Sequence, residues 1–211
     1  MVGLFTAEQD NCPIFNKKSF LYSKKHNLIG ILHRITISTG EGVMKASEFI
    51  GMKVIDKEAN EIGKVAEIAV LFKQCLLDKV FISVGSALNK KFLVVVDDDI
   101  AEVGDYLQLK LNTQEIEEQV KVDKIEKFLG KGTRYNEFIG KTVLNKTGMD
   151  VGKISDLMID PKGCLIHNIV VTTGGTFNKK HLMISDEDIE AMGDYLIIKL
   201  DQDQINDRIV N

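Results

Sequence analysis

Residues 47–65 read SEFIGMKVIDKEANEIGKV, and residues 136–154 read NEFIGKTVLNKTGMDVGKI, which is nearly the same pattern. A shift of 89 residues aligns Glu48–Leu111 with Glu137–Leu200 without a gap, and 25 of these 64 positions are identical. Self-similarity at one fixed spacing is the signature of a duplicated structural unit. The sequence therefore predicts two copies of one fold in tandem.

The composition is that of an ordinary globular protein with no preferred polyanionic partner. The chain has 211 residues, a formal net charge of -4 and a pI near 5.6, so it has no overall attraction to nucleic acid or to anionic lipid. The three cysteines lie far apart, a pattern that favours a reducing compartment. No segment approaches the roughly 20 apolar residues that cross a bilayer. We expect a soluble, cytoplasmic protein with no direct membrane insertion.

Residues 1–43 have no counterpart in the repeat and no sustained helical or strand period. Met44 stands directly before the first copy, and the Glu41-Gly42 codons are compatible with a prokaryotic ribosome-binding sequence. One interpretation is that Met44 is the true start; the other is a translated, disordered N-terminal arm. The expected organisation is this extension (1–43), a first domain with its terminal helix (44–120), a linker (121–136) and a second domain with its terminal helix (137–211).

Each copy contains short apolar runs that are typical of β-strands, separated by turn residues. The stretch from EFIG to GK is expected to form the entry strand and first turn of each copy. The run at 62–71 does not alternate perfectly, which predicts a bulge or a barrel corner. Five or six such strands within about 65 residues indicate a small β-barrel. Ile116 with Val120, and Ile205 with Ile209, are spaced i,i+4 and predict a short amphipathic helix after each barrel. The expected fold class is all-β, with two tandem barrels and short helices.

The repeated pattern resembles the PRC-barrel family. The resemblance rests on EFIG, the following GK, the acidic DDDI turn and the final GDYLQL strand, and both copies carry it, from about residue 46 to 200. The family's turn glycine is present as Gly148 in the second copy, while Ala59-Asn60 replaces it in the first. Because Asn tolerates the left-handed conformation, we expect that turn to survive through Asn60.

We expect no catalytic residue, no metal site and no cofactor. Cys75 and Cys164 are equivalent, but neither has a partner at ligand spacing in both copies, which favours buried small hydrophobes. The acidic runs 97–99 and 186–188 lack the pattern of a calcium loop and are expected to cap a short helical turn. LGKGT at 129–133 lacks the context of a phosphate loop.

A repeated Asn-Lys-Lys is the strongest candidate for partner binding. The candidate residues are Asn89, Lys90, Lys91, Asn178, Lys179 and Lys180. They could form basic contacts for an acidic partner, or they could be solvated hairpin loops, which are common. RNA binding would call for aromatic residues among the lysines and a basic domain, so nucleic acid is not expected.

The resemblance implies a docking module, because PRC barrels occur in the photosynthetic reaction-centre H subunit and in RimM-type ribosome maturation factors. Tandem barrels without another domain resemble archaeal cell-division proteins that bind SepF, which anchors the FtsZ ring. The expected function is thus a non-catalytic protein–protein adaptor of archaeal type, recruited to the division site by a SepF-like partner; the alternative is a ribosome or RNA maturation factor. A partner segment would bind by strand addition or apolar docking. The two barrels would form an internal pseudo-dimer or a homodimer, or present two sites.

Function is expected where the two copies differ on their surfaces. Two such places are Phe72 against Pro161, and residues 86–88 against 175–177.

Overall fold

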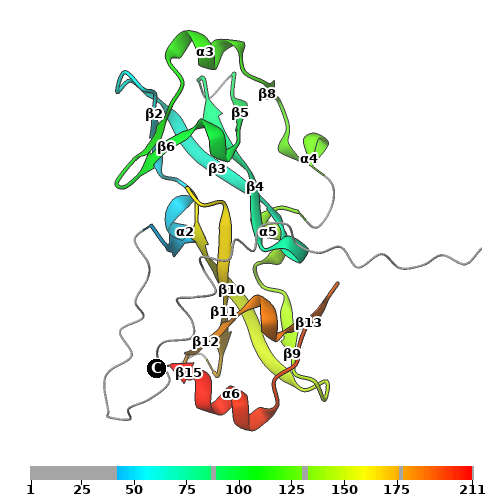
Figure 1. The fold of residues 1–211 in the computed structure, drawn as a ribbon. Coiled ribbons are helices and arrows are strands. Elements are labelled where there is room, and N and C mark those ends of the chain that lie inside the picture. The colour runs from blue at the N-terminus through cyan, green and yellow to red at the C-terminus, as the bar shows by residue number, and fades with distance from the viewer. Residues whose placement is uncertain (1–41, 87–88, 130–132, 176–177, 211) are drawn as a thin grey trace, which may run out of the picture. The chain divides into compact units, whose positions relative to one another are not determined.

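Two copies of one strand arrangement join into a continuous curled sheet in the computed structural model (Figure 1). The structure describes residues 42–86, 89–129, 133–175 and 178–210, which belong to one compact unit. The predictions for residues 1–41 lie outside the described residues. The expected fold class is confirmed: the protein is mainly β, with two tandem small barrels and short helices.

The first copy and the linker contain the following elements. They are β1 Met44–Lys45, α2 Ala46–Phe49, β2 Lys53–Ile55, β3 Glu61–Leu71, η1 Phe72–Gln74, β4 Leu76–Val84, β5 Lys91–Val95, η2 Asp97–Asp99, β6 Ile100–Val103, β7 Leu107–Leu109, α3 Thr113–Glu118, β8 Lys121–Val122 and α4 Ile125–Phe128.

The second copy repeats this order. Its elements are α5 Tyr135–Phe138, β9 Thr142–Leu144, β10 Asp150–Asp160, β11 Leu165–Thr173, β12 Lys180–Ile184, η3 Asp186–Asp188, β13 Ile189–Met192, β14 Leu196–Ile198, α6 Gln202–Arg208 and β15 Ile209–Val210.

The strand order reads the same from both ends when equivalent strands are matched. It runs β13-β14-β9-β10-β11-β4-β3-β2-β7-β6, so β13 and β6 lie at the two ends. The copies meet where Leu76 of β4 pairs with its own equivalent, Leu165 of β11. Around this pair, Leu77 N–H donates to the Cys164 carbonyl at 3.0 Å and Ile166 N–H donates to the Cys75 carbonyl at 2.8 Å. These reciprocal bonds define a pseudo-twofold relation between the copies.

The segment leading into each copy pairs with the long strand of the other copy. Residues 44–45 of β1 pair with Ile159 and Met158 of β10. Reciprocally, Arg134 bridges to Ala69 of β3, and Val70 N–H donates to the Thr133 carbonyl at 2.7 Å. Each copy thus supplies backbone partners to the other. One apolar cluster contains buried side chains from both copies, including Phe49 and Phe138.

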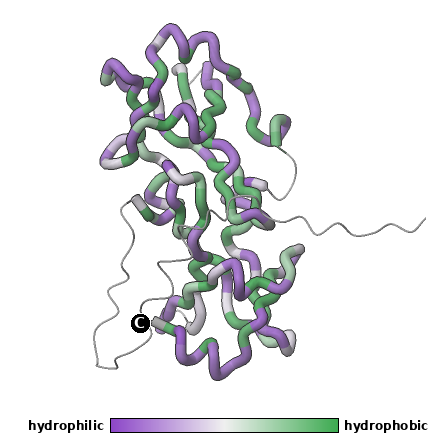
Figure 2. The backbone as a smooth tube through the Cα atoms, in the orientation of Figure 1, coloured by the Kyte–Doolittle hydropathy of each residue, from purple (hydrophilic) through white to green (hydrophobic). Residues whose placement is uncertain are grey.

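Hydrophobic and hydrophilic residues are interleaved along the chain (Figure 2). The irregular burial along β3 and β10 arises from bulges between Val65 and Glu67 and between Ile154 and Asp156, so the predicted bulge is confirmed. The glycine of the GK motif is required by close packing: a Cβ on Gly63 would collide with the backbone carbonyl of Ser83. A side chain there would push β3 away from β4.

Two details of the prediction are wrong. EFIG does not begin a strand: Phe49 and Phe138 each end a short helix, α2 or α5, and face the core. Ile116 of α3 and Ile205 of α6 are buried, but their predicted partners lie outside the helices: Val120 follows α3 with 58% of its surface exposed, and Ile209 belongs to β15.

The turn after β2 survives without its glycine, but not in the expected way. Ala59, rather than Asn60, takes the left-handed conformation, with φ at 67°. Asn60 is instead fixed to Asp56, to which it donates from its backbone N–H at 2.8 Å and from its side-chain amide at 3.0 Å. The strain therefore falls on alanine, for which this conformation is costly.

Candidate functional site

The first residue of the repeated motif contacts a buried carboxylate of the other copy. Ser47 precedes EFIG in the first copy and contacts Asp156 on β10; Asn136 precedes it in the second copy and contacts Glu67 on β3. Both acids sit beside the bulges and are at most 7% exposed. The motif that identifies the duplication thus also joins the two copies.

Asp156 is the more fully satisfied of the two carboxylates. It accepts from the backbone N–H of Ser47 at 3.1 Å, from the Ser47 hydroxyl, and from its neighbour Leu157 N–H at 2.8 Å. The hydroxyl of Tyr135 also donates to it, at 3.1 Å. Burial and the Asp156 charge together raise the pKa of Tyr135, so the phenol remains a neutral donor over the ordinary pH range.

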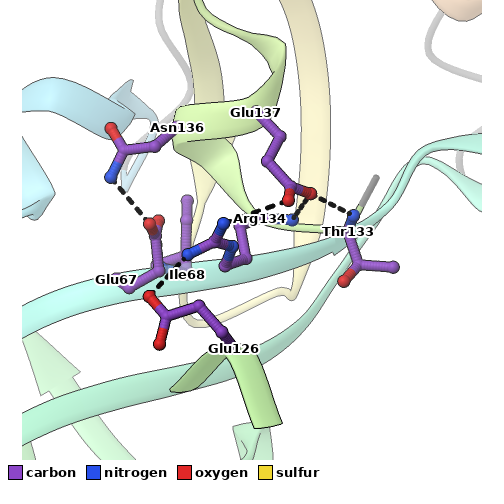
Figure 3. A network of polar contacts seen from close by, with 7 residues as sticks. All are labelled: Glu67, Ile68, Glu126, Thr133, Arg134, Asn136 and Glu137. Carbon is purple, nitrogen blue, oxygen red and sulfur yellow. Dashed lines mark hydrogen bonds and ion pairs between the residues drawn. The ribbon is translucent and has the colours of Figure 1, made fainter. Parts of the chain in front are cut away.

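Glu67 lies in a less favourable environment, which Figure 3 shows from close by. Its carboxylate accepts from the Asn136 side-chain amide at 2.7 Å and from Ile68 N–H at 3.0 Å. Burial raises the pKa of Glu67 despite these bonds and the nearby Arg134. Arg134 itself is held by Glu126 at 2.9 Å and Glu137 at 3.1 Å. The Glu67 carboxylate is therefore buried near the Arg134 guanidinium, which is already paired with Glu126 and Glu137.

A partly open apolar cleft of about 510 Å³ lies at the junction of the two copies. It is lined by Val70, Leu71, Phe72, Gln74, Thr133, Phe138, Lys141, Ile189, Glu190, Ala191, Met192 and Gly193. The rings of Phe72 and Phe138, one from each copy, lie 4.2 Å apart between centroids. Lys141 crosses the cleft, with its ammonium 5.8 Å from the Phe138 ring centroid and 2.5 Å from the Gly193 carbonyl.

One wall of this junction cleft is a sheet edge. β13 is paired with β14 on one side, and within the described part of the chain no strand pairs with its other side. An unpaired edge next to an apolar recess can accept an extended segment by adding a strand.

The equivalent position on the other side of the pseudo-twofold has different residues. Pro161 replaces Phe72, and Glu102 replaces Ala191. There, Lys162 Nζ and Glu102 Oε1 form an ion pair at 2.7 Å between the two walls. The residues equivalent to this pair at the junction cleft are Lys73 and Ala191, and alanine has no carboxylate to pair with a lysine. The predicted difference between Phe72 and Pro161 thus falls on the cleft itself.

The structure does not bring the two predicted lysine loops together. β4 and β11 meet at their first residues and run in opposite directions, so the loops that follow them lie at opposite ends. Asn89, Lys90 and Lys91 are exposed in the first copy, and Asn178 and Lys179 in the second, with Lys180 half-buried. Their role in binding stays a prediction. Residues 87–88 and 176–177 lie outside the described residues.

The other polar candidates are explained by local backbone geometry. Asp99 accepts from Val96 N–H at 3.1 Å, and Asp188 accepts from Ser185 N–H at 3.0 Å, so the predicted capping of a short helical turn is confirmed. Cys75 and Cys164 are half-buried at φ of 52°, and burial raises the pKa of the Cys164 thiol to about 12. In the described ranges, no three His, Cys, Asp or Glu side chains are gathered as a metal site. The helices of those ranges are all too short or too polar to span a membrane.

Sequence reasoning missed the pairs Ser47–Asp156 and Asn136–Glu67. One signal could have revealed them: an acid stands at the same position of both copies, within a run that is otherwise largely apolar. Its partners could not be found from the sequence, because Ser47 and Asp156 are 109 residues apart.

The fold and its junction define a class of protein: a duplicated small β-barrel whose halves are joined about a pseudo-twofold. A family model for the PRC-barrel domain matches residues 41–116 and again residues 131–205, and the chain belongs to this family. A search of curated proteins found no match.

Proposed function

We propose that this protein is a non-catalytic adaptor that binds an extended segment of a partner protein in the junction cleft. The observation that supports this is an open apolar recess with an unpaired strand edge, β13, as one wall. Backbone hydrogen bonds to β13 would supply affinity, and an apolar side chain of the partner would supply specificity by filling the recess.

The chemistry of the lining favours a bulky apolar side chain. Phe72, Phe138 and Met192 provide the apolar surface, while Lys141 and Glu190 are the charged residues of the lining. Burying one Leu- or Phe-sized side chain contributes about 1.5–3 kcal/mol. Added to strand pairing, this suits a reversible complex.

The two copies differ at Glu102 and Ala191, and this difference supports one partner-binding site instead of two. The ion pair between Lys162 and Glu102 includes the residue equivalent to Ala191, which lines the junction cleft. Because Ala191 has no carboxylate, the ion pair cannot form there. The expected internal pseudo-dimer is part of this proposal, and the reciprocal bonds at Leu76 and Leu165 support it.

The finer proposal concerns the partner. The resemblance to archaeal cell-division PRC-barrel proteins makes a SepF-like division protein the expected one, and it would recruit this cytoplasmic protein to the division site. The alternative function, ribosome or RNA maturation, would give a different set of partners in the same experiment.

The test is affinity capture from an archaeal lysate, with identification of bound proteins by mass spectrometry. Ala191→Glu introduces at the cleft the acid found at the equivalent position, and Glu102→Ala is the matched control. We expect division proteins with the wild type and Glu102→Ala, and a loss of at least tenfold with Ala191→Glu. Ribosomal proteins in place of division proteins, or equal capture by both variants, would overturn the proposal.

A further inference from the structure

A second concave surface is formed by the linker between the two copies. It has a volume of about 380 Å³ and is lined by Lys121, Val122, Asp123, Lys124, Lys127 and Phe128. Three of these six residues are lysines, in a chain whose net charge is -4. This local positive charge is therefore opposite to the charge of the whole protein.

Strand pairing brings the first lysine loop next to this surface. β5 pairs with β8 through Phe92↔Val122 and Leu93↔Lys121. Because the two strands are antiparallel, Lys90 and Lys91, which precede Phe92, lie at the same end of this strand pair as Asp123 and Lys124, which follow Val122. Lys90 is positioned over the Phe92 ring, with its ammonium 5.2 Å from the centroid. We call Lys90, Lys121, Lys124 and Lys127 the linker basic surface.

An exposed aromatic ring lies within this surface. Phe128 is 42% exposed, and its ring meets that of Phe81 edge to face at 5.9 Å between centroids. Val120, at the start of the linker, is 58% exposed. Phe81 belongs to a small apolar cluster on this side of the sheet, against which Val122 packs. The surface thus combines positive charge with an exposed aromatic ring that packs against a buried apolar cluster.

Several acidic side chains lie near the lysines of this groove. Glu126 on α4 is engaged by Arg134 at 2.9 Å. Glu117 and Glu118 are exposed on α3, ahead of the groove, and Lys121 Nζ donates to the Glu117 backbone carbonyl at 3.0 Å. Asp123 is the acid within the lining. An anion would therefore meet Lys124 and Lys127, which are exposed and line the groove.

We propose that the linker basic surface binds a short acidic peptide segment carrying a bulky apolar residue. Its carboxylates would pair with the lysines, and its apolar side chain would cover Phe128. Charge complementarity of this kind governs recognition and association rate more than it governs affinity. A long polyanion such as RNA would extend beyond four lysines onto an acidic protein, whereas a short segment would stay within the surface.

The second copy supplies a natural control. Its Asn-Lys-Lys loop precedes β12, which pairs with β15 through His181↔Val210 and Leu182↔Ile209. Ile209 pairs with Leu182 as Lys121 pairs with the equivalent Leu93, so this lysine loop has no lysine from β15 beside it. The same sequence motif thus occurs with a basic linker strand in one copy and with an apolar one in the other.

The test is fluorescence anisotropy of the full chain with a labelled synthetic peptide of five glutamates flanking one phenylalanine. We expect Lys124→Glu/Lys127→Glu to weaken binding about tenfold or more, and Lys179→Glu/Lys180→Glu to change it less than twofold. Phe128→Ala is expected to weaken the same peptide while leaving a peptide with alanine in place of phenylalanine unaffected. Ala191→Glu, at the junction cleft, should bind the peptide as the wild type does, so a failure of either proposal is recognised separately.

Three results would overturn this inference: no saturable peptide binding, equal losses in both lysine pairs, or tighter binding of a single-stranded oligonucleotide of equal charge. Circular dichroism melts of each variant exclude unfolding as the cause of a loss, since all the substituted side chains except Lys180 are exposed.

Discussion

Replacing Tyr135 by phenylalanine isolates one hydrogen bond at the junction. The Tyr135 side chain is 6% exposed, and its hydroxyl donates to Asp156 at 3.1 Å. The substitution keeps the ring and removes the donor, so a buried carboxylate loses one of its partners. A hydrogen bond to a charged group contributes about 1.5–3 kcal/mol. We therefore expect the free energy of unfolding to fall by about 2 kcal/mol, because Ser47 and Leu157 continue to donate to Asp156.

The assay is urea and thermal unfolding followed by circular dichroism. For a protein of this size, each kcal/mol shifts the Tm by about 2–4 °C, so the expected decrease is about 4–8 °C. Tyr195→Phe is the matched control, because that tyrosine is 54% exposed and its loss should change stability by less than about 0.5 kcal/mol. If Tyr135→Phe also stays within about 0.5 kcal/mol of the wild type, the contribution assigned to this bond is refuted.

Tyr135 also makes the stability of the protein depend on pH in the alkaline range. The folded-state pKa of Tyr135 is raised above its ordinary value of 10.0, chiefly by burial and then by the charge of Asp156. The unfolded chain therefore releases this proton first. The stabilisation is complete below pH 10 and is lost as the pH rises above it. We expect the wild type and Tyr195→Phe to lose more stability above pH 10 than Tyr135→Phe does.

Three substitutions test the left-handed backbone positions of the two turns and the buried carboxylate of Glu67. Ala59→Gly relieves a left-handed alanine and should raise the free energy of unfolding by about 0.5–1 kcal/mol, whereas Gly148→Ala, at the equivalent turn, should lower it by about 1 kcal/mol in urea unfolding. Glu67→Gln keeps the size of the side chain and removes a buried charge whose pKa is raised, chiefly by burial. Because the folded-state pKa of Glu67 exceeds its unfolded value, the contribution of Glu67 to stability falls as the pH rises above about 4.5, and Glu67→Gln lacks this loss. A steeper loss in Glu67→Gln than in the wild type between pH 4 and 8 would contradict this account.

The sequence predicted what depends on local chemistry or on comparison of the two copies. Turn residues, the bulge in β3 and the helix after each barrel are local features, and the alignment of the two copies let each feature be recognised twice. The contacts between the copies were not predictable in this way. Leu76 pairs with its own equivalent, Leu165, and no pattern of either strand reveals that the two barrels meet there.

The wrong predictions have a physical cause in the same contacts. EFIG was expected to belong to the entry strand of each copy, yet Phe49 and Phe138 each end a short helix and pack into a core shared by both copies. At the turn, Asn60 was the better candidate for left-handed backbone, but Asp56 holds its side chain and backbone, and Ala59 takes the strained position. Tertiary contacts thus outweighed local preference in both places.

Covalent linkage of the two copies permits what a symmetric homodimer does not. In a homodimer of one barrel, a substitution at the rim of one cleft appears at both, so an open cleft on one side requires an open cleft on the other. In the tandem chain, the acids that join the copies are retained at both positions, as Glu67 and Asp156. The residues at the edges of the two equivalent clefts can differ, as Ala191 and Glu102 do. Duplication followed by change at the rim alone can therefore produce one open cleft and one bridged by an ion pair on a single fold. We accordingly expect Glu102→Ala, combined with Pro161→Phe, to allow a second partner segment to bind, which isothermal titration would register as a stoichiometry of two instead of one.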